Sequence, residues 1–148
     1  MQTVVINNAN SPAYPTSSGV PQGTCIGPLM FLIFVNDLTS SLPPGSFCSM
    51  YADDSKIFTI NDHTKLQLAL DKLGEWSSKW DFDISTEKTA ILGFGRNHPN
   101  VVFTLNGRQL TQLHSIKDLG ITYSDTFDFE DYINDITAKA RASCSCAM

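Results

Sequence analysis

The stretch Tyr51-Ala52-Asp53-Asp54 places two adjacent acids between two apolar segments. The flanking segments, residues 46–50 and 55–60, have the composition and partial alternation of short strands. We therefore predict a β-hairpin with the acids at its tip. Because neighbouring side chains on a straight strand point to opposite faces, only a tight turn lets both carboxylates approach one spot. Two like charges held that close repel each other, and a divalent cation is the simplest relief.

Length and composition are those of one globular domain. The 148 residues include 42% hydrophobic residues, enough to form a core. The longest apolar run, residues 29–35, is far shorter than the roughly 20 residues that span a bilayer, and the first residues lack the pattern of a signal peptide. We therefore expect an intracellular protein with no membrane partner.

The four cysteines do not form a metal-binding pattern. Cys25, Cys48, Cys144 and Cys146 make no C-x-x-C pair, and no histidine follows them at zinc-ligand spacing. We interpret them as buried or free thiols in a reducing compartment.

The charge of the chain is acidic and unevenly distributed. A net charge of −5 argues, by itself, against a nucleic-acid-binding surface. All Lys and Arg residues lie at Lys56 or later, and residues 125–135 carry five acids with no base among them, which is typical of a solvated face. If the chain contacts nucleic acid, most of the basic contacts must come from sequence outside it.

Strand and helix patterns alternate irregularly along the chain and predict an α+β fold. The turn-forming Asn106-Gly107 predicts a hairpin between 101–105 and 109–110, and Asp62 is a predicted helix cap. The remaining expected elements are a strand at 2–6, a turn at 7–10, an edge segment at 11–16, a helix at 28–38, strands at 89–94 and 116–123, and a helix at 129–142.

The helix that begins after Asp62 has one apolar face. Its two tryptophans, Trp76 and Trp80, are four residues apart and therefore share that face. We predict that they pack in the core, and the alternative is a base-stacking role. The predicted face consists of Leu66, Ala69, Leu70, Leu73, Trp76 and Trp80.

Short motifs occur in a fixed order along the chain. They are SGVPQG at 18–23, GPL at 27–29, FLI at 31–33, NDL at 36–38, YADD at 51–54, LGEWSSKW at 73–80, EKT at 87–89, LNG at 105–107 and KDLGI at 117–121. In wording, order and spacing they resemble the palm motifs of reverse transcriptases from non-LTR (LINE-type) retrotransposons. The resemblance covers nearly all of the chain and implies RNA-directed DNA polymerase activity, with an RNA template, a DNA primer and dNTPs as partners.

The resemblance implies a metal-binding role for the paired acids. Asp53 and Asp54 match the catalytic carboxylates that hold two Mg²⁺ ions during phosphoryl transfer, with Mn²⁺ as a substitute. The structural alternative is a solvated turn.

The resemblance also implies roles for other motif residues. Lys88 matches a lysine that is thought to protonate the pyrophosphate leaving group, and the alternative is a surface lysine at a turn. The nucleotide- and template-binding residues would be Pro21, Gln22, Gly23, Tyr51 and Ala52, and the primer grip would be Leu119, Gly120 and Ile121.

The chain departs from the family pattern at identifiable positions. Ser85 stands where the family commonly has Asn, and Tyr51 replaces a more usual Phe or Leu. The family's first carboxylate motif and the fingers have no counterpart in residues 1–148. Asp37 does not substitute for the missing acid, because a capping or surface role is expected for it.

We therefore expect residues 1–148 to be a single partial reverse transcriptase domain. It would be a palm fragment with an antiparallel sheet backed by helices, and residues 129–148 would begin the thumb. The missing upstream part of the polymerase would leave surface exposed, so self-association is expected. Two functions stay open: a fragment of an active polymerase, or an inactive palm remnant that acts as a binding module or has no selected function.

Overall fold

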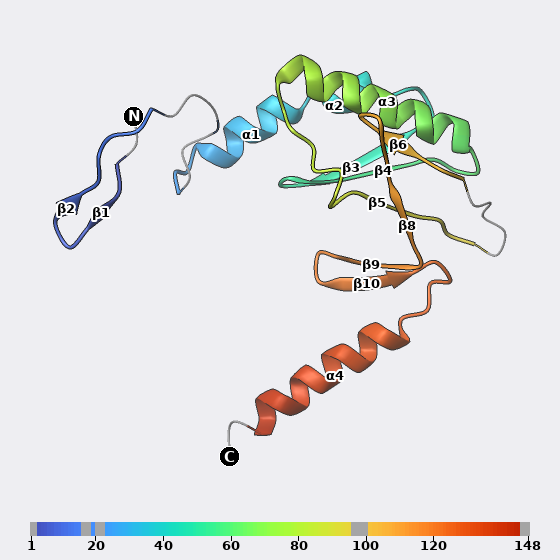
Figure 1. Cartoon of the computed structure of the whole chain (residues 1–148). Helices are drawn as coiled ribbons and strands as arrows, with labels where there is room; N and C mark the ends of the chain where they lie inside the picture. Colours follow the sequence, from blue (N-terminus) through green and yellow to red (C-terminus); the bar gives the residue numbers. More distant parts are fainter. Residues whose placement is uncertain (1–2, 16–18, 20–22, 96–100, 146–148) are drawn as a thin grey trace.

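The computed structural model describes residues 3–15, 19, 23–95 and 101–145, and these combine helices with small strand pairs, as an α+β fold requires. Four helices and ten strands lie within this part of the chain (Figure 1). The helices are α1 (Gly27–Val35), α2 (Leu38–Ser41), α3 (His63–Trp80) and α4 (Glu130–Ser145). The strands are β1 (Val5–Ile6), β2 (Ala9–Asn10), β3 (Phe47–Tyr51), β4 (Asp54–Phe58), β5 (Ala90–Leu92), β6 (Thr104–Leu105), β7 (Arg108–Gln109), β8 (Thr111–Leu113), β9 (Ser115–Asp118) and β10 (Ile121–Ser124).

The predicted hairpin around the two acids is present. Strands β3 and β4 pair antiparallel, with Tyr51 opposite Asp54 and Phe47 opposite Phe58. Met50 and Ile57 are half-buried and pack against the core, so one face of the hairpin is held by the hydrophobic interior. The acids lie at the turn of this anchored hairpin.

The helix expected at 28–38 is divided into two helices. Pro28 lies in the first turn of α1, as predicted. The N–H of Asn36 bonds to the carbonyl of Ile33, three residues back, so the last turn tightens and α1 ends at Val35. Helix α2 then begins at Leu38.

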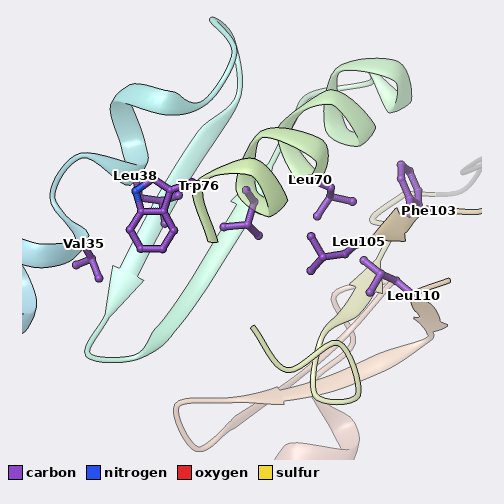
Figure 2. Packing of buried hydrophobic residues seen from close by; sticks show 8 residues of the cluster. Val35, Leu38, Leu70, Trp76, Phe103, Leu105 and Leu110 are labelled. Carbon is purple, nitrogen blue, oxygen red and sulfur yellow. The ribbon is translucent and has the colours of Figure 1, made fainter. Parts of the chain in front are cut away.

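The long helix α3 is the centre of the core. The carboxylate of Asp62 accepts a hydrogen bond from the backbone N–H of Lys65 at 2.8 Å, which confirms the predicted cap. One face of α3 packs against α2 and β6 (Figure 2). The buried cluster consists of Val35, Leu38, Leu70, Leu73, Trp76, Phe103, Leu105 and Leu110.

The predicted core face of α3 is confirmed for most of its residues. Ala69, Leu70, Leu73 and Trp76 are buried. Trp80 differs, because 41% of it stays exposed at the end of the helix. Its ring still packs edge-on against Phe34, with the centroids 5.7 Å apart.

The strands form separate pairs rather than the single antiparallel sheet that we expected. Within the described residues each of five sheets has two strands. Four pairs are antiparallel, and the fifth, β5 with β8, is parallel, with Ile91 opposite Gln112. The predicted Asn106-Gly107 turn joins β6 and β7.

The segment expected to form one strand at 116–123 is a hairpin. Strands β9 and β10 pair antiparallel, with Asp118 opposite Ile121. Leu119 and Gly120 form the turn and have positive φ angles of 47° and 87°. Glycine adopts such angles readily, so Gly120 allows a chain reversal rather than a close approach within a continuous strand.

Two smaller expectations concern the ends of the chain and the thiols. Asn7 and Asn8 form the first turn, but the return strand β2 already begins at Ala9. The described cysteines, Cys25, Cys48 and Cys144, are free, and burial raises the pKa of the Cys48 thiol. Cys146 lies outside the described residues.

Much of the surface is apolar and exposed. The accessible surface is 11440 Å², whereas a compact monomer of this size exposes about 7,500 Å². On α1, the side chains of Leu29, Met30, Leu32 and Ile33 are all at least half exposed. Figure 1 shows β1–β2 and α4 extending away from the core. Among the described residues, no helix is both long and apolar enough to cross a membrane.

Candidate functional site

The turn between β3 and β4 carries both acids, with Asp53 in the turn and Asp54 at the start of β4. Tyr51 and Asp54 close the hairpin as paired residues, and Ala52 has a left-handed φ of 51°. For a residue with a Cβ this conformation costs roughly 1–2 kcal/mol, which the pairing of the strands must offset. Asp53 and Asp54 are both exposed at this turn.

No described cation forms an ion pair with Asp53 or Asp54. The nearest basic residue in the strand is Lys56, two residues after Asp54 and on the same face of β4. Lys56 is engaged elsewhere, because its ammonium pairs with Asp118. That hydrogen bond raises the pKa of Lys56, partial desolvation opposes the rise, and attraction from Asp54 adds a smaller increase. The negative charge at the turn is therefore open to an external cation.

The chemistry of the paired acids fits a magnesium ion. Mg²⁺ prefers carboxylate oxygens and is often held by one or two carboxylates together with substrate phosphates and water. The described residues offer no cluster of three or more acids, histidines or cysteines that could hold a metal alone. Asp53 and Asp54 can thus supply part of a metal site whose other ligands come from elsewhere.

The ion pair between Lys56 and Asp118 joins this hairpin to β9–β10. Asp118 is the last residue of β9 and directly precedes the turn at Leu119 and Gly120. Ile121, the first residue of β10, is half-buried, whereas Leu119 is 51% exposed. The structure therefore connects two predicted sites, the acidic turn and the predicted primer grip.

Lys88 is not connected to the acids. It is exposed in the turn before β5, and its backbone N–H donates to the carbonyl of Ser85 at 3.3 Å. Within the described chain, no hydrogen bond or ion pair joins its side chain to Asp53 or Asp54.

The SGVPQG motif is described only in part. Gly23 is exposed and has a φ of 77°, a conformation that favours glycine. Pro21 and Gln22 lie outside the described residues.

Sequence reasoning missed the partners of Asp37. Its Oδ1 accepts the indole N–H of Trp76 at 2.7 Å, and its Oδ2 accepts that of Trp80 at 3.1 Å. We expected a capping or surface role, and Asp37 does occupy the N-cap position of α2, but its side chain makes no cap hydrogen bond and instead ties the start of α2 to α3. Asp37 and Trp76 also line a surface cavity of ≈ 340 Å³, which contains none of the predicted site residues.

Lys56 and Asp118 were also missed as partners. The sequence contained a partial signal, since Lys56 follows Asp54 at the two-residue spacing of one strand face. The partner of Lys56 lies 62 positions later and belongs to a hairpin that we expected to be one strand. Local pattern reading therefore could not pair them.

Comparison with known proteins places the chain in a family. The family model described as "Reverse transcriptase (RNA-dependent DNA polymerase)" matches residues 1–123. No solved structure matches the chain significantly.

Curated relatives come from mobile elements of insects. The RNA-directed DNA polymerase from mobile element jockey of Drosophila melanogaster is 29% identical over 93% of this chain and 16% of its own length. The jockey polymerase of Drosophila funebris is 31% identical over 84% of this chain and 15% of its own length. The probable RNA-directed DNA polymerase from transposon X-element of Drosophila melanogaster is 26% identical over 94% of this chain and 16% of its own length.

The chain thus spans about one sixth of the length of these relatives. The family model covers most of the chain, and the relatives belong to LINE-type elements. The order of the motifs, the paired acids at a hairpin turn and these matches agree: the chain belongs to the reverse transcriptase (RNA-dependent DNA polymerase) family and is similar to the enzymes of non-LTR retrotransposons.

Proposed function

We propose that this chain is the palm portion of a polymerase that synthesises DNA on an RNA template. The observation that carries the proposal is the pair of exposed acids, Asp53 and Asp54, at the β3–β4 turn in a chain of the reverse transcriptase family. The partners of the reaction are an RNA template, a DNA primer and dNTPs. Residues 1–148 act as a single partial domain, and residues 129–148 begin the thumb.

The two acids hold the metal in this proposal. Asp53 and Asp54 bind Mg²⁺, two ions in the complete polymerase, and Mn²⁺ can replace it. When bound, the ions neutralise phosphate charge and activate the primer hydroxyl. The protein holds the two carboxylates in position, because both lie at the tight turn of a hairpin and one face of that hairpin is anchored in the core. Ala52 presents only a methyl group beside them.

Other motif residues complete the site in this proposal. Pro21, Gln22 and Gly23 pack beside the template and the incoming nucleotide, and Tyr51 and Ala52 border the nucleotide. The primer end is supported by Leu119 and Gly120 in the β9–β10 turn and by Ile121, which follows that turn. Lys88 donates a proton to the pyrophosphate leaving group. Because no hydrogen bond or ion pair joins its side chain to the acids in the described chain, this role requires bound substrate to draw Lys88 toward them.

A second function is favoured by a specific observation. The described residues expose a large apolar surface, which includes Leu29, Met30, Leu32 and Ile33 of α1. This surface suits an inactive palm remnant that binds a partner through it.

Metal binding tests the role proposed for the two acids. Calorimetric titration of the chain with Mg²⁺ and with Mn²⁺ should show binding that Asp53→Asn and Asp54→Asn each weaken. Asp131→Asn, which removes an exposed acid of α4, is the matched control and should bind normally. Equal binding by all four proteins would contradict the proposed metal site.

Catalysis needs the rest of a polymerase. Residues 1–148 can replace the matching segment of the jockey polymerase of Drosophila melanogaster, and the chimera can be assayed for primer extension on an RNA template. We expect extension by the chimera, none with Asp53→Asn and normal extension with Asp131→Asn. A folded but inactive chimera would favour the binding-module function.

A further inference from the structure

The ammonium of Lys56 joins the two hairpins that carry the proposed reaction. Lys56 lies on β4, two residues after Asp54, and Asp118 ends β9. The side chain of Asp118 is only 19% exposed, whereas that of Lys56 is 45% exposed. The contact thus joins a half-exposed lysine on one hairpin to a mostly buried carboxylate on the other.

The position of this contact relates directly to the two turns. Strand geometry puts Asp54 and Lys56 on one face of β4, about 7 Å apart. Asp118 is one residue before the turn at Leu119 and Gly120. In Figure 1 the turns of both hairpins point to the same side of the molecule. The ion pair therefore lies near the turn of each hairpin.

Among the described residues, the ion pair between Lys56 and Asp118 joins the two hairpins directly. Each hairpin is its own two-stranded sheet, with no ladder hydrogen bonds between β4 and β9. The other links of the β9–β10 hairpin lie at the end opposite to its turn. They are the short connection from β8, a hydrogen bond from the N–H of Gly95 to the carbonyl of Asp125 at 3.2 Å, and the stacking of Phe94 on Phe127 with centroids 4.4 Å apart. A hinge at that end would let the turn at Leu119 and Gly120 move relative to the acids unless a side chain restrained it.

We propose that Lys56 and Asp118 are positioning residues, which hold the Leu119–Gly120 turn at a set distance from the paired acids. This inference rests on the proposed function, in which that turn supports the primer end and the acids hold the metal. Neither Lys56 nor Asp118 needs to touch substrate.

Because the ammonium side chain of Lys56 is 45% exposed, solvent screens the ion pair and its contribution to folding stability should be small, so its effect should be geometric. The test measures the distance between the hairpins in the full chain. Spin labels are attached to Asp53→Cys and Lys117→Cys after the native cysteines are changed to Ser, and the labelled chain is diluted into unlabelled chain. Pulsed dipolar spectroscopy then reports the distribution of distances within one molecule.

We expect one narrow distribution for the parent chain and a broadened or shifted one for Lys56→Ala. Lys56→Arg should restore the narrow distribution, as should the charge exchange Lys56→Asp with Asp118→Lys. Lys139→Ala is the matched control, because it removes an exposed lysine that pairs with Asp135 within α4, and it should change nothing. An unchanged distribution in Lys56→Ala would overturn the proposal.

A second measurement separates this inference from the proposed function. With a single label at Lys117→Cys and native acids, added Mn²⁺ should reduce the nitroxide signal, and Asp53→Asn with Asp54→Asn should abolish that loss. Lys56→Ala should make the loss smaller at saturating Mn²⁺, and Lys56→Arg should recover it. If Mn²⁺ has no effect on the parent chain, the metal site fails, whereas the distance distributions still decide the positioning role.

Discussion

The indole N–H of Trp76 donates to Oδ1 of Asp37 at 2.7 Å, across 39 positions of sequence. Trp76 is 4% exposed, so its N–H has no ready access to water as an alternative partner. The second oxygen of Asp37 accepts the indole N–H of Trp80. One carboxylate thus satisfies two tryptophans and fastens the region after α1 to α3.

Asp37→Asn should destabilise the chain by about 1–3 kcal/mol, because an amide has one acceptor oxygen and turns a donor toward the other indole. Denaturant unfolding measures this loss. Asp83→Asn, at an exposed position, is the control and should change little. In a Trp80→Phe background, Asp37→Asn should cost less, since the amide oxygen can then face Trp76. An equal cost in both backgrounds would show that the indoles do not share the carboxylate.

Without metal, Asp54→Asn should change stability by less than about 0.5 kcal/mol or increase it. The substitution relieves repulsion between neighbouring carboxylates, although it also removes a weak attraction to Lys56. Thermal melts in chelator make the comparison, with Asp131→Asn as control. Millimolar Mg²⁺ should shift the balance toward the parent chain. A clear loss of stability of the mutant in chelator would show that Asp54 contributes mainly to folding.

The isolated chain should not extend a primer on an RNA template. Its described residues supply only Asp53 and Asp54 to the proposed metal site. A two-metal site that lacks a carboxylate loses several kcal/mol of transition-state stabilisation. A primer-extension assay with Mg²⁺ or Mn²⁺ decides this. Incorporation that disappears with Asp53→Asn would prove the prediction wrong.

The chain should self-associate through exposed apolar side chains. Leu29 and Ile33 are 58% and 69% exposed on one side of α1. Size-exclusion chromatography at several concentrations should show species larger than a monomer, and Leu29→Glu with Ile33→Glu should reduce them. Thr39→Glu, which adds a charge at an exposed position of α2, should have no such effect. A sharp monomer peak at all concentrations would contradict the prediction.

Gly74 and Asn106 should show coupled effects on stability. Gly74 is buried within α3, and a Cβ there would overlap Oδ1 of Asn106. Gly74→Ala should therefore gain little, although alanine favours a helix by about 1 kcal/mol. In an Asn106→Gly background the full gain should appear, because glycine tolerates the φ of 51° at that position. Equal effects of Gly74→Ala in both backgrounds, measured by denaturant unfolding, would disprove the contact.

The sequence by itself determined the features that depend on neighbouring residues. The YADD hairpin, the Asn106-Gly107 turn and the Asp62 cap of α3 follow from local backbone preferences and side-chain hydrogen bonds, and all three are present. The same local motifs carried the resemblance to reverse transcriptases, which the family match confirms. The roles assigned to individual residues stay predictions: Asp53, Asp54 and Lys88 in catalysis, Pro21, Gln22, Gly23, Tyr51 and Ala52 in nucleotide and template binding, and Leu119, Gly120 and Ile121 in the primer grip.

Only the tertiary structure decided which distant residues meet. It turned the segment at 116–123 into a hairpin, paired β5 with β8 in parallel and divided the strands into five small sheets. It also decided that Asp37 accepts hydrogen bonds from two tryptophans and that Lys56 pairs with Asp118. These contacts depend on how whole elements pack, and a polar side chain accepts whichever donor that packing brings near it. The local periodicity of the sequence does not indicate which distant residue a polar side chain will meet.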